Sequence, residues 1–149
     1  MKHSALTDQI IAAFYQVYNA LGWGFLEKVY HGALLHELRK HALGVQTKAK
    51  FDVHYDGVLV GEYFADILVE GLVILELKAV ERLADTHETQ LVNYLKASGI
   101  EVGLVLNFGP KPQLRRKVFD HTRPTPLDDS SVPNVSSSGT DDPADEFFQ

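Results

Sequence analysis

The chain has 149 residues, of which 45% are hydrophobic and 23% charged, as is ordinary for a single soluble domain with a sizeable core. It contains no cysteine, which excludes disulfides, zinc–thiolate sites and cysteine nucleophiles. No stretch approaches the ~18 apolar residues of a membrane span, and no signal segment follows Met1, so the expected location is the cytoplasm.

The formal net charge of −6 is unevenly distributed. Residues 1–119 contain 13 Lys or Arg and 13 Asp or Glu, whereas residues 120–149 contain Arg123 and seven acids. This second segment is rich in Ser and Pro and has too little apolar surface to offset the entropy lost on ordering. We therefore expect a neutral folded domain over 1–119 and an acidic, disordered tail over 120–149. The tail could compete with substrate phosphates, act only as a solubilising appendage, or bind a partner through its last residues, "DEFFQ".

The first part of the chain has the periodicity of two helices. Residues 6–21 carry apolar side chains at helical spacing, Thr7 or Asp8 is suited to cap the first turn, and the glycines of "GWG" (22–24) end the segment. A second helix is expected at about 26–42. The aromatic residues around this connection are expected to belong to the core: Phe14, Tyr15, Tyr18, Trp23 and Phe25.

Beyond Gly44 the period changes from helical to alternating. The expected elements are an exposed edge strand at 46–55, a turn at Asp56-Gly57, a strand at 58–69, a turn at Glu70-Gly71, a strand at 72–80, a helix at 83–98, a strand at 101–107 and a short last element at 113–119. The order α-α-β-β-β-α-β predicts an α/β fold, with helices flanking a mixed sheet of four or five strands.

Two charges interrupt the third of these strands, which reads "VILELKAV" over residues 73–80. Alternate side chains of a strand share a face, so Glu76 and Lys78 point the same way. Because an unpaired buried carboxylate is costly, a simple Glu76–Lys78 ion pair on a half-exposed face is one explanation.

The preceding strand offers a second explanation. A three-residue connection, 70–72, would place Asp66 directly opposite Glu76, about 5 Å away. Two carboxylates that close repel each other unless one is protonated or a cation lies between them, and Mg²⁺ is bound through one or two carboxylates plus waters. A neighbouring lysine orients water or stabilises developing negative charge. Asp66, Glu76 and Lys78 therefore predict a metal-dependent hydrolytic site.

The sequence from Asp66 to Glu76-Leu77-Lys78 resembles the PD-(D/E)XK nuclease superfamily, with Ala65 in place of the proline. The segment "GFLEKVY" (24–30) resembles the signature of the GxxExxY proteins, a bacterial branch of that superfamily, through Gly24, Glu27 and Tyr30. Residues 87–99 and 102–109 are similar to later blocks of the same family, and the resemblance covers about 5–119. It implies a restriction-endonuclease-like core and a nuclease activity that uses Mg²⁺ or Mn²⁺.

The resemblance also implies roles for individual residues. Asp66 and Glu76 would bind the metal with help from the Leu77 carbonyl, Glu27 would supply an additional carboxylate, and Lys78 would assist the attacking water. Gln90 and Tyr94 resemble the Gln-x-x-x-Tyr motif of RecB-like nucleases, in which these two side chains support the catalytic face. The alternatives are structural: Glu27 suits the first turn of a helix, and Gln90 and Tyr94 would form an ordinary polar–aromatic stripe.

Two other features of the sequence each allow a functional and a structural interpretation. His87, one turn before Gln90, contacts a phosphate or a metal-bound water, or it only decorates the surface. The cluster Lys111, Arg115, Arg116 and Lys117 contacts a phosphate backbone, or it is a solvated face.

The expected function is thus a metal-dependent phosphodiester hydrolase acting on nucleic acid, with DNA favoured over RNA. The alternative is a non-catalytic module that keeps the nuclease fold and binds nucleic acid or protein.

Overall fold

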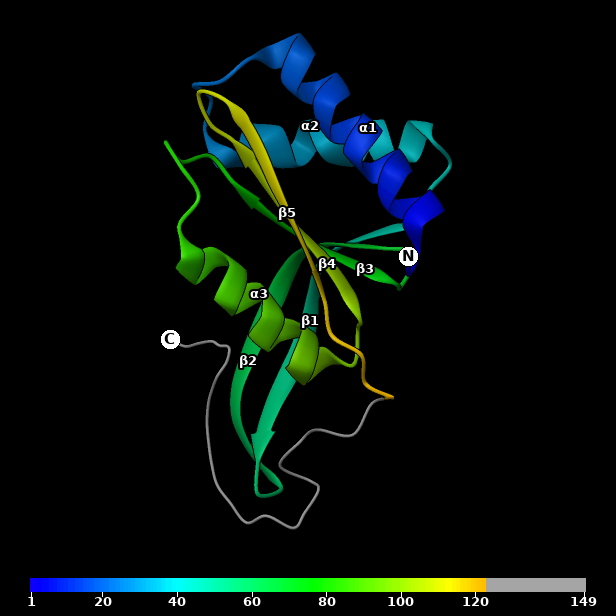
Figure 1. The fold of residues 1–149 in the computed structure, drawn as a ribbon, viewed down its shortest axis with the longest axis vertical. Helices are drawn as coiled ribbons and strands as arrows, with labels where there is room; N and C mark the ends of the chain where they lie inside the picture. Colours follow the sequence, from blue (N-terminus) through cyan, green and yellow to red (C-terminus); the bar gives the residue numbers. More distant parts are fainter. Residues whose placement is uncertain (123–149) are drawn as a thin grey trace.

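The computed structural model describes residues 1–122, and residues 123–149, which include most of the predicted acidic tail, lie outside the described residues. The elements are α1 (Ser4–Leu21), α2 (Glu27–Lys40), β1 (Val45–Tyr55), β2 (Val58–Val69), β3 (Val73–Lys78), α3 (Asp85–Ser98), β4 (Val102–Phe108) and β5 (Pro112–Val118). They follow the predicted order, and the short last element is a fifth strand (Figure 1). None of the helices in residues 1–122 is long and apolar enough to cross a membrane.

The five strands form one mixed sheet in the order β1-β2-β3-β4-β5. Strands β3 and β4 are parallel, and every other neighbouring pair is antiparallel. The predicted edge strand is β1, and β3, which carries Glu76 and Lys78, is the central strand. The mixed sheet flanked by helices is the restriction-endonuclease-like α/β arrangement expected from the sequence.

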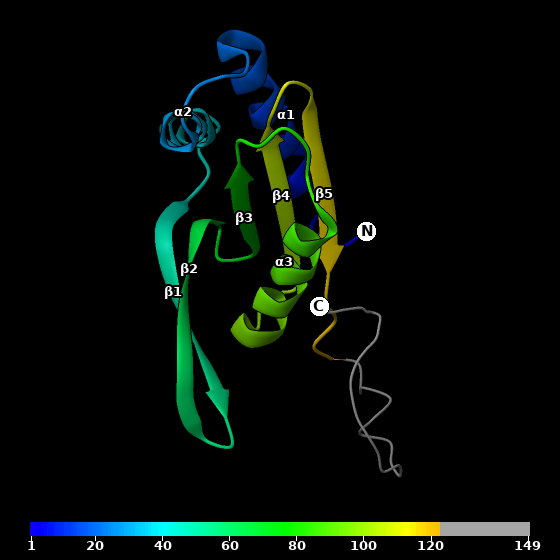
Figure 2. The same cartoon turned by 90° about the vertical axis from the view of Figure 1, so that its left-hand side faces the viewer.

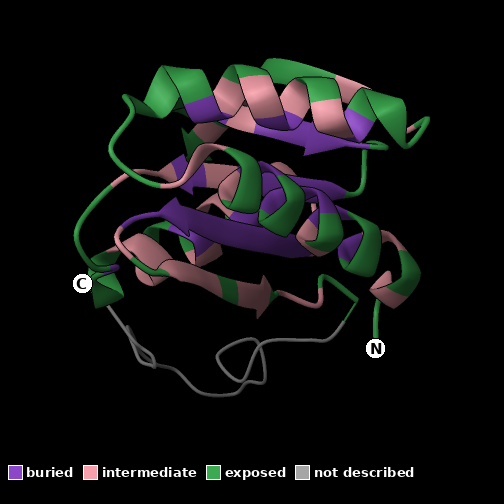
Figure 3. Cartoon of the chain, turned by 90° about the horizontal axis from the view of Figure 1, so that it is seen from above, coloured by how far each residue is buried: buried purple, intermediate pink, exposed green. Residues whose placement is uncertain are grey.

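The helices cover opposite faces of this sheet. Helices α1 and α2 pack on one face with Val73, Leu75 and Leu77 of β3, and α3 packs on the other face with Ile74. Figure 2 shows α3 in front of β4 with α1 behind it, and Figure 3 shows the buried strands between partly exposed helices. Since alternate residues share a face, Glu76 and Lys78 lie on the α3 side of the central strand.

Two tight turns set the strand register, as predicted. Asp56 and Gly57 both have positive φ (57° and 79°), and so do Glu70 and Gly71 (55° and 67°). Such turns match the twist of antiparallel strands. Strand β2 pairs with β3 only over Ile67–Val69, so the outer part of the β1–β2 hairpin extends beyond the rest of the sheet (Figure 1).

Two local predictions are wrong. Helix α1 begins one turn earlier than expected, with His3 at its N-cap, and Thr7 is a buried helical residue whose hydroxyl donates to the Ser4 carbonyl at 3.1 Å. The predicted aromatic core is only partly formed, because Phe14 is buried whereas Trp23 and Phe25 are exposed. These two residues lie in the connection between α1 and α2.

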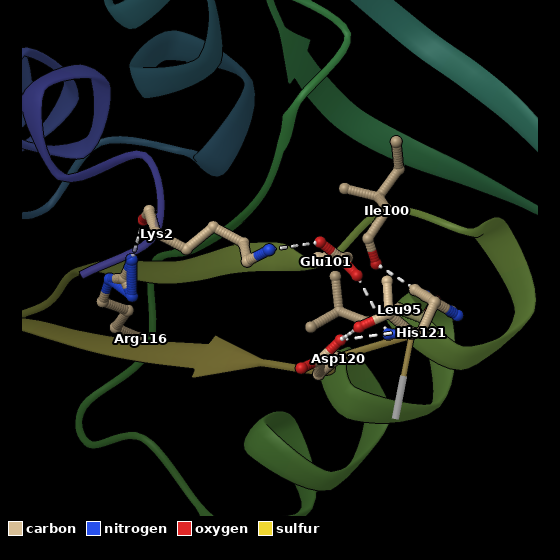
Figure 4. Close-up of polar contacts among 8 residues, drawn as sticks. Lys2, Leu95, Ile100, Glu101, Arg116, Asp120 and His121 are labelled. Carbon is tan, nitrogen blue, oxygen red and sulfur yellow. Dashed lines mark hydrogen bonds and ion pairs between the residues drawn. The ribbon is translucent and has the colours of Figure 1, made fainter. Parts of the chain in front are cut away.

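The two ends of the described chain meet beside β5 (Figure 4). Lys2 Nζ pairs with Glu101 Oε1 at 2.8 Å, and the backbone N–H of His121 donates to Glu101 Oε2 at 2.9 Å. His121 Nε2 also donates to the Leu95 carbonyl at 3.0 Å. Glu101 therefore links the start of α1 to the residues that follow β5.

Candidate active site

Asp66 and Glu76 lie on adjacent antiparallel strands joined by the predicted three-residue connection. The paired residues run from Val69–Val73 to Ile67–Leu75, so Asp66 and Glu76 would be the next pair. At that point side chains replace the backbone ladder: Asp66 Oδ2 accepts the Leu77 N–H at 2.8 Å, and Glu76 Oε2 accepts the Asp66 N–H at 3.4 Å. Both carboxylates are thereby held against the backbone of the other's strand.

The backbone around Asp66 is irregular on the β1 side as well. Pairing between β1 and β2 includes Thr47–Ile67 and Ala49–Ala65 but omits Lys48, which lies between them opposite Asp66. Lys48 has a φ of 52°, a left-handed conformation that costs a non-glycine residue about 1–3 kcal/mol. Such outliers are concentrated at functional sites, and here the outlier coincides with the start of the candidate site.

Burial and the neighbouring charges strongly perturb the pKa of Glu76. Burial, and then the negative charge of Asp66, raise the pKa of Glu76 to about 8, although the Asp66 N–H and Lys78 oppose this shift. At neutral pH the Glu76 carboxyl is therefore mostly protonated. No ion pair joins Glu76 to Lys78 within residues 1–122, so the simple ion-pair explanation is not supported.

Glu27 begins α2 and faces the same site from the other layer. Partial burial of its carboxylate and the charge of Asp66 raise its pKa, whereas the charges of Lys78 and His31 lower it. The side chain as a whole is exposed, however. Among residues 1–122, no three His, Cys, Asp or Glu side chains converge closely enough to hold a metal ion. The expected three-carboxylate group is therefore not assembled, and the close pair is Asp66 with Glu76.

His31 joins the site although the sequence did not single it out for this role. It follows Glu27 by one helical turn, and its Nε2 donates to the Asp66 carbonyl at 3.0 Å. The sequence signal for this role was that Glu27 and His31 share one face of the helix. A single histidine on a helix face is too common for that signal to identify a site. His31 thus ties α2 to the strand that carries Asp66.

The Gln-x-x-x-Tyr pair lies on α3 beside the carboxylates. Burial and the charges of Glu76 and Asp66 raise the pKa of Tyr94, and a hydrogen bond with Gln90 opposes the shift. The Tyr94 ring stacks on Tyr63 of β2 with centroids 3.6 Å apart, and Tyr63 stacks on Phe51 of β1. Tyr94 therefore closes one side of the site, whereas Gln90 is exposed and contacts the site through Tyr94.

His87 lies at the first turn of α3 and faces Lys78. Its Nδ1 accepts the Ala84 N–H at 3.1 Å, so the neutral ring carries its proton on Nε2. Burial and the positive charge of Lys78 lower its pKa. His87 is therefore a neutral hydrogen-bond donor at neutral pH.

Asn107 holds the segment that follows Lys78, and the sequence reading missed it. It is fully buried and lies beside Lys78 in the parallel β3–β4 register. Its Oδ1 accepts the Val80 N–H at 2.9 Å, and its Nδ2 donates to the Val80 carbonyl at 3.0 Å. The signal was a single amide inside the apolar strand "VGLVLNF", since a buried amide needs specific partners.

The signature tyrosine has a structural position. Tyr30 is fully buried, its hydroxyl donates to the Gly22 carbonyl at 2.7 Å, and it accepts the Phe25 N–H at 3.2 Å. Its ring stacks on Phe108 with centroids 4.3 Å apart. Tyr30 thus shapes the α1–α2 connection and takes no part in the carboxylate cluster.

The basic cluster is largely occupied by partners within the chain. Arg115 and Lys117 pair with Glu88 of α3 at 3.2 Å and 2.6 Å, and Arg116 donates to the Lys2 carbonyl on the opposite face of β5. Lys111 lies exposed at the β4–β5 turn. The strand alternation therefore divides the cluster between two faces, and no continuous basic surface results from it.

The match to one protein family agrees with this fold. A family model described as the PD-(D/E)XK nuclease superfamily matches residues 4–118. Among solved structures, SSO0001 is 18% identical with a TM-score of 0.48; the match covers 64% of this chain and 52% of that protein, so the chain spans about half its length. An alkaline exonuclease (LHK-Exo) from Laribacter hongkongensis is 11% identical with a TM-score of 0.41, and the match covers 82% of this chain and 73% of the exonuclease. No curated protein matches the chain. Because the family model spans all three helices, the whole sheet and the Asp66–Lys78 segment, the chain belongs to the PD-(D/E)XK nuclease superfamily.

Proposed function

We propose that this domain hydrolyses phosphodiester bonds of nucleic acid and uses Mg²⁺ or Mn²⁺ as its cofactor. The observation that carries the proposal is the interlocked pair of Asp66 and Glu76, with Lys78 two residues along the same strand. An arrangement that raises a carboxyl pKa to about 8 costs stability and is typical of functional sites. DNA is the favoured substrate, and the GxxExxY signature points to the bacterial branch of the superfamily.

The donor set fits a hard divalent cation. Each of the two carboxylates uses one oxygen to accept a backbone N–H, and no other hydrogen bond from residues 1–122 reaches either group. Asp66 and Glu76, aided by the Leu77 carbonyl and by Glu27 from α2, would hold the ion, since Mg²⁺ needs only one or two carboxylates plus waters. When bound, the ion supplies charge stabilisation at the phosphoryl group and promotes ionisation of water.

The surrounding residues suit phosphodiester hydrolysis. The Lys78 ammonium lies on the same strand face as Glu76, where it stabilises negative charge that develops on the phosphoryl oxygens. His87 presents its Nε2–H as a neutral donor on the Lys78 side, and Tyr94, supported by Gln90, closes the α3 side.

One observation favours the alternative, a non-catalytic module that binds nucleic acid or protein. Within residues 1–122 no group of three acidic or histidine side chains converges on a metal position. A module that has lost catalysis would keep the sheet and the helices without needing that convergence. The two functions differ in the effect of Lys78 on cleavage, because a binding module has no hydrolysis rate for this residue to increase.

The deciding experiment is cleavage of single-stranded and duplex DNA and RNA in Mg²⁺ or Mn²⁺, with EDTA as the metal-free arm. We expect activity with the divalent ion only, and a loss of about 10²–10³ in kcat for Lys78→Ala. Lys50→Ala is the matched control, because Lys50 is an exposed lysine of β1 away from the site, and this variant should keep wild-type activity. Absence of cleavage of every substrate, or equal rates for wild type and Lys78→Ala, would leave the binding module as the better description.

A further inference from the structure

The connection between α1 and α2 exposes a group of large apolar side chains. Trp23 is 57% exposed, Phe25 49% and Leu26 68%. These three side chains lie within four residues of the chain, and a contiguous exposed apolar patch often marks a binding surface. The next residue along the chain is Glu27, which belongs to the candidate active site.

The backbone that carries these side chains is fixed. Gly22 and Gly24 have φ values of 68° and 114°, which glycine adopts at no steric cost, and the buried Tyr30 hydroxyl bonds to Gly22 and Phe25 on either side of Trp23. Tyr18 anchors the end of α1 by donating to the Gly109 and Pro110 carbonyls at 2.8 Å and 2.9 Å. The indole is therefore presented on a pre-organised support, which reduces the entropy lost when a ligand binds.

The position of this connection relates it to the candidate site. Figures 1 and 2 show it above the carboxyl end of β3, the strand that carries Glu76 and Lys78. Asp66 and Lys78 both influence the Glu27 carboxylate, so the first residue of α2 adjoins the reacting centre. A polynucleotide with a phosphate at Lys78 would therefore pass beside the apolar group with its neighbouring nucleotide.

The charge of the domain explains why an aromatic contact would be useful. Residues 1–119 are electrically balanced, and Arg115, Lys117 and Arg116 are already engaged by Glu88 and by the Lys2 carbonyl. Counter-ion release, which usually dominates nucleic-acid binding, is then weak. Stacking of bases on aromatic rings supplies affinity without charge, about 1–3 kcal/mol per base.

We propose that Trp23, with Phe25 and Leu26, is a stacking site for an unpaired base of a single-stranded nucleic-acid segment. The site rests on the proposed nuclease function and deepens it, because it specifies a single strand or a frayed end as substrate. Bases inside an intact duplex do not expose a face to the indole. The protein therefore prefers single strands over blunt duplexes of the same sequence.

Trp23 is the only tryptophan of the chain, so intrinsic tryptophan fluorescence reports on this position alone. The full-length protein is titrated in EDTA, which prevents cleavage, with a single-stranded DNA of about 12 nucleotides, its RNA counterpart and the blunt DNA duplex. We expect saturable quenching by the single strands and little by the duplex. By anisotropy of a labelled strand, Trp23→Ala should bind about 5- to 150-fold more weakly.

Two variants separate stacking from general effects. Trp23→Phe keeps an aromatic face and should retain most of the affinity. Tyr55→Ala removes another highly exposed aromatic side chain, at the tip of the β1–β2 hairpin, and should bind as wild type does. Unfolding midpoints of all variants, measured in parallel, show that each is folded.

The proposal is overturned if Trp23→Ala binds single strands as tightly as wild type, if the duplex quenches equally, or if no oligonucleotide binds. It is also overturned if sedimentation shows that Trp23→Ala dissociates a dimer, because a second copy of the chain would then cover the apolar group. Quenching without cleavage under any condition would refute catalysis while supporting the stacking site. Cleavage with unchanged binding of Trp23→Ala would do the reverse.

Discussion

Asp66 and Glu76 are bound to each other's strands and not to each other. Glu76 Oε2 accepts the N–H of Asp66 at 3.4 Å, and Asp66 Oδ2 accepts the N–H of Leu77, the residue after Glu76, at 2.8 Å. This reciprocal arrangement keeps two carboxyl groups close while leaving part of each group available. Burial of Glu76, and then the nearby charge of Asp66, raise the pKa of its carboxyl group.

Replacement of Glu76 by Gln should alter the pH dependence of stability. The folded-state pKa of Glu76 is about 8, against an ordinary value of 4.5, so between these values the folded protein binds a proton that the unfolded chain releases. The contribution of this group to stability is thus lost as pH rises through that window. In metal-free buffer, Glu76→Gln should be more stable than wild type by on the order of 1 kcal/mol at about pH 9, and the difference should shrink towards about pH 5.

Urea unfolding at both pH values measures this difference directly. Glu62→Gln, an exposed carboxylate of β2 that pairs with Lys50, is the matched control and should show no such trend. If Glu76→Gln unfolds at a lower denaturant concentration than wild type across the whole range, Glu76 is a structural residue.

Addition of a divalent cation should stabilise the wild-type protein near neutral pH. Binding at a hundredfold excess over Kd contributes about 2.7 kcal/mol, and it displaces the proton held by Glu76, so about one proton is released per ion. Calorimetry in two buffers of different ionisation enthalpy detects that proton. Asp66→Ala should abolish both the heat and the stabilisation, and Asp52→Ala, in the exposed part of β1, should abolish neither. A wild-type heat no larger than that of Asp66→Ala argues against a metal site here.

Removal of the Tyr30 hydroxyl should destabilise the fold without removing any group from the carboxylate cluster. Tyr30→Phe leaves the Gly22 carbonyl and the Phe25 N–H without their partner, at a cost of about 1–3 kcal/mol. Tyr15→Phe, on the exposed side of α1, should change stability by less than about 0.5 kcal/mol. Thermal unfolding compares the two variants. Equal melting temperatures would show that the hydrogen bonds of the Tyr30 hydroxyl contribute nothing to stability.

Replacement of Lys48 by Gly should stabilise the protein, which is unusual for a glycine inside a strand. Lys48 has a φ of 52°, so glycine relieves a left-handed conformation costing about 1–3 kcal/mol, which exceeds the entropy that glycine adds to the unfolded chain. Gln46→Gly, in the regularly paired part of β1, should destabilise instead by about 0.5–1 kcal/mol. Chemical denaturation measures whether each substitution raises or lowers the free energy of unfolding. A loss of stability for both variants would mean that the backbone at position 48 carries no strain.

The sequence alone determined the strands, their turns and the proximity of Asp66 to Glu76. Those features depend on local rules: alternation places Glu76 and Lys78 on one face, and a three-residue connection sets which residues of β2 and β3 meet. The resemblance to the superfamily added the restriction-endonuclease-like fold; its GxxExxY signature directed attention to Glu27, and its Gln-x-x-x-Tyr motif to Gln90 and Tyr94.

Only the tertiary structure decided which other residues surround these carboxylates and how closely they converge. His31 reaches Asp66 because α2 packs across the sheet, and Asn107 reaches Val80 because β4 lies parallel to β3, both contacts between residues far apart in the chain. The same packing leaves Trp23 exposed, although an aromatic residue is by itself equally suited to the core. Local periodicity reports which side of an element is apolar, but whether another element covers that side depends on where distant segments pack.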